Sequence, residues 1–159
     1  MYPTRIGICE MILTKAEIEV AGTFEVTLDS GNDTFSINST GTIVNIGLVG
    51  NTSYNLSGKV SSVGDISIAY NLAGRVSSIG NMPISYNLAG KISSICGISV
   101  SYNLAGRVSS IGNISISYNL AGKIILIGNN PFTYNLAGKI SSGNRVSVFN
   151  GVAFYLKGV

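Results

Sequence analysis

Apolar and polar positions alternate in short segments of this chain, and the segments recur. In the clearest copy, residues 114–118 read Ile-Ser-Ile-Ser-Tyr. Period-two alternation of β-branched and aromatic residues predicts a half-buried β-strand. Residues 119–122 then read Asn-Leu-Ala-Gly, which predicts a type I turn closed by a glycine at positive φ. A second, shorter strand follows from Lys123, and an Ile-Gly-Asn sequence at residues 127–129 predicts the next turn.

The Tyr-Asn-Leu core of this unit returns every sixteen residues, without an insertion, through the middle of the chain. It begins at Tyr54, Tyr70, Tyr86, Tyr102, Tyr118 and Tyr134. A fixed period is the signature of a repeat architecture, in which one supersecondary unit is stacked many times. We therefore predict an all-β fold of 16-residue tandem β-repeats, each with two strands and two turns.

Two arrangements of these strands satisfy the pattern. The first is an antiparallel hairpin meander, and the alternative is a β-solenoid with two strands in each coil. One cation recurs in every repeat, and in a solenoid these cations would stack about 4.8 Å apart. In a meander they lie roughly 10 Å apart, about a Debye length at moderate salt. Like charges therefore favour the meander.

The repeat core Tyr-Asn-x-Ala-Gly-(Lys/Arg)-(Ile/Val)-Ser resembles the YD repeats of Rhs-type shell proteins, Tyr-Asp-x-x-Gly-Arg-(Leu/Val). The resemblance covers residues 54–142. It implies antiparallel β-hairpins joined into a continuous, spiralling sheet. The chain departs from the family in having Asn for Asp, a shorter unit and too few residues to build a closed shell, so the toxin-encapsulating role is not carried over.

The period divides the chain into three parts. Residues 1–53 are expected to form a diverged β head or cap, and residues 54–142 form six regular repeats. Residues 143–159 are expected to supply closing strands and a C-terminal cap. Diverged terminal copies are typical of repeat stacks, because their outer faces meet solvent or a partner.

Charge is sparse and unevenly placed. Charged residues make up 11% of the chain, against about 25% in typical domains. After residue 33 the only acid is Asp65, whereas the body carries a row of cations at one repeat position. This candidate row for an anionic partner is Lys59, Arg75, Lys91, Arg107, Lys123 and Lys139. A polysaccharide is one such partner, whereas nucleic acid is not expected because exposed aromatic residues are not interleaved with the cations.

No catalytic constellation can be assembled from the residues of this sequence. The sequence has no histidine, so the commonest general base and metal ligand is missing. We therefore predict no catalytic residues, no cofactor and no metal site, and we expect a protein that is not an enzyme. The two cysteines, Cys9 and Cys96, are too few for a disulfide framework and are expected to be free thiols.

One repeat departs from the pattern of the others. Where other copies carry a Ser pair, this copy has Ile125 and Leu126, and Phe132 follows in the next strand. Apolar side chains on the polar side of a sheet are costly in water. These three residues are our candidate interface. The head or tail of the same chain could cover it, or another chain, which we favour. The repeat tyrosines share a side with apolar residues and are expected to form a buried row.

These observations favour a structural β-repeat protein that self-associates, as a homo-oligomer or a filament, in an extracellular sheath or matrix. The alternative is a module that binds polysaccharide or another surface. No run of about eighteen apolar residues is present, so a transmembrane helix is not expected. The N-terminus does not resemble a signal peptide, and the composition suggests a cell-surface or extracellular location.

Overall fold

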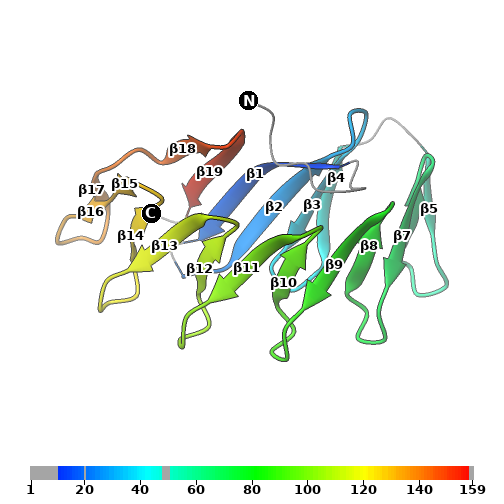
Figure 1. The fold of residues 1–159 in the computed structure, drawn as a ribbon, viewed down its shortest axis with the longest axis horizontal. Coiled ribbons are helices and arrows are strands. Elements are labelled where there is room, and N and C mark those ends of the chain that lie inside the picture. The colour runs from blue at the N-terminus through cyan, green and yellow to red at the C-terminus, as the bar shows by residue number, and fades with distance from the viewer. Residues whose placement is uncertain (1–10, 20, 48–50, 158–159) are drawn as a thin grey trace.

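The computed structural model describes residues 11–19, 21–47 and 51–157. This part of the chain is all-β, with nineteen strands, no helix and no closed barrel. A six-stranded sheet lies behind an eleven-stranded sheet, and one hydrophobic core is shared between them (Figure 1). The predicted all-β repeat fold is confirmed.

The repeats form the larger sheet, in which the strands follow one another in chain order from β5 to β15. They are β5 (Thr52–Tyr54), β6 (Val60–Val63), β7 (Ile66–Tyr70), β8 (Val76–Ile79), β9 (Met82–Tyr86), β10 (Ile92–Ile95), β11 (Ile98–Tyr102), β12 (Val108–Ile111), β13 (Ile114–Tyr118), β14 (Ile124–Ile127) and β15 (Asn130–Pro131). The sixth repeat continues in a separate pair, β16 (Thr133–Tyr134) and β17 (Ile140–Ser142). Each strand pairs antiparallel with its neighbours in sequence, which confirms the hairpin meander and makes the solenoid alternative wrong.

A β-bulge in the second strand of each repeat decides which side chains reach the core. Ser101 pairs with Ser110, and the next residue, Tyr102, pairs with Val108, so Ser109 is the extra residue. The bulge turns both Val108 and Ile111 toward the core, although they are three residues apart. The same shift recurs in the other five repeats. Strict alternation would have exposed one apolar residue of each such pair.

Strands from both ends of the chain make the second layer. Its order is β18-β19-β1-β2-β3-β4, and β1 pairs parallel with β19. The strands are β1 (Ile12–Glu19), β2 (Phe24–Asp29), β3 (Thr34–Asn38), β4 (Ile43–Gly47), β18 (Val146–Phe149) and β19 (Val152–Lys157). The regions expected to cap the two ends of the repeats therefore combine into one sheet that covers a face of the repeats.

Three backbone hydrogen bonds join the layers where the head turns meet the repeat sheet. The N–H groups of Val76, Ile92 and Val108 donate to the carbonyls of Gly41, Ser39 and Gly22 respectively, at 2.9 to 3.0 Å. Each donor begins a repeat strand and would otherwise be buried beside the bulge, where a missing partner costs about 1–3 kcal/mol. The head turns thus stabilise the repeats that they cover.

The second turn of the third repeat carries a cysteine in place of the usual glycine. Cys96 has a φ of 46°, and Gly97 after it has a φ of 83°. Cys96 is disulfide-bonded, so the expectation of a free thiol is wrong for this residue. Cys9 lies outside the described residues.

The turn glycines have the predicted positive φ, and Gly106 offers a test of why glycine is needed there. Its φ is 81°, and a Cβ added there would lie 2.8 Å from the Lys91 ammonium. We expect Gly106→Val to lower the free energy of unfolding by more than about 1 kcal/mol, because a β-branched residue is strained at positive φ. Urea unfolding measures this. Ala105→Val in the same exposed turn is the control, and equal losses in the two variants would contradict the assignment.

Candidate functional site: the hairpin-tip edge

One edge of the repeat sheet is formed by the tips of its long hairpins, and each tip carries an exposed leucine. We call this the tip edge and define it by Leu56, Leu72, Leu88, Leu104, Leu120 and Leu136. Each of these side chains has a relative exposure of 109 to 110%, so none of them packs against its own chain. In Figure 1 the tips of the hairpins from β5–β6 to β13–β14 project along the lower side of the molecule, and the β16–β17 hairpin lies at its left end.

The turn that presents each leucine is built by its neighbours. In the fourth repeat, the Gly106 N–H donates to the Asn103 carbonyl at 2.9 Å. The Asn103 Oδ1 accepts hydrogen bonds from the N–H groups of Ala105 and Arg107, both at 3.0 Å. An Asn side chain and a glycine at positive φ are therefore sufficient to close the loop. The leucine side chain between them is fully exposed and makes no packing contact in the turn.

The predicted cation row lies along the same edge, where each cation reaches the next repeat. The Lys59 ammonium donates to the carbonyl of Gly74 at 2.6 Å and lies 5.3 Å from the centre of the Tyr70 ring. Lys91 does the same with Gly106 and Tyr102. Three further members of the row contact a ring at the same offset: Arg75 on Tyr86, Arg107 on Tyr118 and Lys123 on Tyr134.

Lys139 is the last member of the row and has no equivalent tyrosine ahead of it. Position 150, at the corresponding offset, is Asn. In the other five cases the cation–π contact is worth about 0.5–1 kcal/mol at an exposed site and increases when the pair is desolvated. The row therefore joins successive repeats to one another. It also places positive charge in the loops that carry the leucines.

Each repeat tyrosine from Tyr70 to Tyr134 is bonded in the opposite direction, to the preceding repeat. The Tyr102 hydroxyl donates to the Ile92 carbonyl at 2.6 Å, and Tyr118 donates to Val108 at the same distance. Tyr70, Tyr86 and Tyr134 make the equivalent bond. The rings are half-buried rather than largely buried, and cations cover the faces that sugars or bases would need for stacking.

Burial changes the acidity of these hydroxyls. Desolvation raises the pKa of Tyr86 to about 12, although the positive charge of Arg75 lowers it in part. The same two effects, with Arg107 as the cation, bring the pKa of Tyr118 to about 12. Burial also raises the pKa of Tyr70, Tyr102 and Tyr134. The hydroxyls thus remain protonated donors at neutral pH.

The predicted interface residues do not share one surface. Ile125 is the bulge residue of β14 and is 36% exposed, whereas Leu126 beside it is half-buried. Phe132 is only 3% exposed, because it occupies the core position that Ile116 holds one repeat earlier. Phe132 is therefore removed from the candidate interface, and Ile125 is what remains of the exposed apolar patch.

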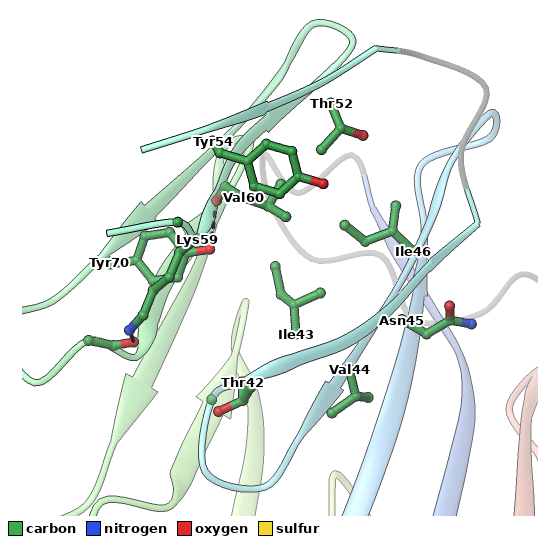
Figure 2. A pocket seen from close by; sticks show the side chains of 13 residues that line it. Thr42, Ile43, Val44, Asn45, Ile46, Thr52, Tyr54, Lys59, Val60 and Tyr70 are labelled. Carbon is green, nitrogen blue, oxygen red and sulfur yellow. Dashed lines mark hydrogen bonds between the residues drawn. The ribbon is translucent and has the colours of Figure 1, made fainter. Parts of the chain in front are cut away.

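Two sheet edges diverge at the beginning of the repeats and leave an open groove of about 520 Å³ (Figure 2). Ile43 and Ile46 of β4 line one side, and Tyr54 and Val60 of β5 and β6 line the other. Thr52 Oγ1 is buried beside the groove without a hydrogen-bond partner. Tyr54, the first of the row, is 64% exposed.

The remaining exposed apolar residues lie on strands at sheet edges. Val44 (44% exposed) is on β4, and Val146 (44%) and Val148 (67%) are on β18. β4 and β18 end opposite sides of the six-stranded sheet, and β5, which carries Tyr54, ends the larger sheet. None of these three strands contains a charged residue or a proline, the usual protection of an edge against pairing. This signal was missed in the sequence, because edge position is a property of topology.

Within the described residues, no three His, Cys, Asp or Glu side chains are grouped so that they could hold a metal ion. That part of the chain also contains no helix able to span a membrane. No protein-family model matches the chain, and a search of curated proteins finds no match.

The raised tyrosine pKa values predict a loss of stability in alkali. Between pH 10, the ordinary pKa of tyrosine, and about 12, the folded protein keeps protons at Tyr86 and Tyr118 that the unfolded chain has released. Their contribution is therefore complete below pH 10 and is lost as the pH rises through 12. Urea unfolding across this range should show a steep fall that is shallower in a Tyr86→Phe/Tyr118→Phe variant. Both partner cations are arginines, which stay charged throughout, and equal slopes would contradict the assignment.

Proposed function

We propose that this chain is a non-enzymatic structural β-repeat protein that self-associates by edge-to-edge strand pairing, as the subunit of an extracellular filament, sheath or matrix. One observation carries the proposal. Apart from the tip leucines and Ile125, the large apolar residues exposed in the described chain lie on three strands that end a sheet. An uncharged edge strand with exposed apolar side chains is a template for another chain.

The geometry of the six-stranded sheet favours head-to-tail growth. Its two edge strands are β4 and β18, which lie at opposite ends of the sheet and differ in sequence. Pairing of β18 in one copy with β4 in the next would continue the sheet across subunits. A heterologous contact of this kind produces a filament when its rotation does not close a ring. The groove beside β4 adds apolar surface to the same contact.

The other end of the larger sheet shows what a protected edge looks like. β15 ends that sheet and contains Pro131, which cannot donate a backbone hydrogen bond to a further strand. The edge strands β4, β5 and β18 contain neither a proline nor a charged residue. Growth through β4, β5 and β18 is thus favoured over pairing at β15. Cys96, as a disulfide-bonded residue, supports an oxidising, extracellular setting.

The test places charge on an edge. Val146→Lys/Val148→Lys puts two ammonium groups on β18, where pairing with another strand would bury them. Size-exclusion chromatography with light scattering, followed by electron microscopy, should show filaments or large oligomers for the unmodified protein and monomers for the variant. Its melting temperature should be nearly unchanged, because both valines are exposed.

The matched control is Leu88→Lys/Leu104→Lys, which adds the same charge at equally apolar, fully exposed positions on the tip edge. This control should assemble as the unmodified protein does. A monomeric unmodified protein, or assembly that survives Val146→Lys/Val148→Lys, would rule out edge pairing through β18.

A further inference from the structure

The tip leucines are exposed without a structural reason inside the chain. The loop is closed by the Asn side chain and the glycine, and Leu104 at 110% exposure touches nothing in its own chain. Exposure of a leucine side chain to water is unfavourable, and it occurs six times along one edge. A contiguous set of exposed apolar side chains on a soluble surface marks an interaction site.

The head contains the same turn, and there the tip is covered. Asn38 accepts hydrogen bonds from the N–H groups of Thr40 and Thr42, as the repeat asparagines do in their loops. Ser39 occupies the leucine position of this turn and is only 5% exposed, with its carbonyl bonded to Ile92. Leucine thus occurs at the tips that remain open, and a polar residue occurs at this docked tip.

The charge along the tip edge has one sign. After Asp65 the sequence contains no acidic residue, so the tips from the second to the sixth repeat have no carboxylate of their own. Lys59, Lys91 and Lys123 each donate to the glycine carbonyl of the following tip. The Arg75 and Arg107 side chains lie against Gly90 and Gly122 in the same way. The tips that carry a leucine beside a cation from the preceding repeat are therefore those of Leu72, Leu88, Leu104, Leu120 and Leu136.

We propose that the tip edge docks on an anionic lipid bilayer surface, with the leucines in the headgroup–acyl boundary and the cations at the level of the lipid phosphates. Insertion of apolar side chains combined with attraction of cations is the physical basis of interfacial membrane binding. The tip edge supplies both in every repeat from the second to the sixth.

Two other occupants fit these observations less well. A second copy placed tip to tip would bring two rows of cations together without a counter-charge. An anionic polysaccharide would neutralise the cations but offers no apolar layer to receive the leucines. Neither explains why apolar and cationic groups recur together in one loop after another.

The shape of the edge makes the proposal specific. In Figure 1 the tips follow a convex arc, on which the β9–β10 and β11–β12 hairpins project farthest and the β5–β6 and β16–β17 hairpins, at its two ends, are set back. Leu88 and Leu104 belong to the two leading hairpins. Leu56 belongs to one of the hairpins that are set back, and apart from the chain neighbours of its turn glycine, Gly58, no atom lies within 4 Å of the Cβ position there, so no cation from another repeat reaches this tip. Leu56 is therefore the natural control.

The binding experiment uses flotation of the full chain with vesicles of phosphatidylcholine alone or with about one third phosphatidylglycerol. We expect binding to the anionic vesicles, and about tenfold weaker binding for Leu88→Ser/Leu104→Ser. Leu56→Ser should change binding by about twofold or less. Salt at about 0.5 M should weaken binding, because it screens the cations. Melting temperatures should be unchanged, since these side chains contact nothing in the fold.

A fluorescence experiment reports insertion directly, because the chain has no tryptophan. Leu104→Trp and Leu56→Trp each introduce a single fluorophore at a fully exposed tip. On anionic vesicles, the emission of Leu104→Trp should shift to the blue and be quenched by brominated acyl chains. The emission of Leu56→Trp should shift much less.

Three results would overturn the proposal. The first is no binding to anionic vesicles, and the second is binding that Leu88→Ser/Leu104→Ser leaves unchanged. The third is a loss of oligomers in that variant without lipid, which would make the tip edge an interface between copies. Failure here is distinguishable from failure of edge pairing, because the β18 variant should still bind vesicles.

Discussion

The β-bulge in the second strand of each repeat is the constraint on which the rest of the structure depends. It places Val108 and Ile111 on one side of β12, and the equivalent pairs on one side of the other second strands. Without it, the repeat sheet would have no continuous apolar face. With it, one face is apolar and is covered by the six-stranded sheet. The polar face then carries the serines.

The bulge also leaves backbone groups that other parts of the chain satisfy. The N–H of Val108 donates to the Gly22 carbonyl in the head, and its own carbonyl accepts the hydroxyl of Tyr118. The head and the next repeat thus bind the same residue from two directions. Arg107 extends onto Tyr118 as well, so that each repeat is joined to its successor by a carbonyl and by a cation. The regularly spaced Lys, Arg and Tyr side chains thus connect successive repeats of the same chain.

What the chain leaves exposed is separated into two kinds of surface. The sheet edges carry valines and a tyrosine on strands that pair on one side only, and the tip edge carries leucines on tight hairpin loops rather than on strands. The first kind suits another strand, and the second suits a deformable apolar layer. A subunit with both could assemble along its sheets while its hairpin tips face a membrane surface. The resemblance to YD repeats stays a prediction.

The sequence by itself determined the local structure. The sixteen-residue period, the Asn-Leu-Ala-Gly turn and the positive φ of Gly106 follow from interactions within a few residues, so pattern and turn chemistry were sufficient to predict them. Only the tertiary structure decided the rest. Phe132 lies in the core rather than an interface, and Val148 lies on a sheet edge. Leu28 and Phe154 belong to the same layer. Each of these placements depends on pairings between residues far apart in the chain. The partly buried state of the tyrosines has the same origin, since a cation from the preceding repeat lies over each ring from Tyr70 onward. Long-range packing is set by the sum of many weak contacts, and no local pattern records it.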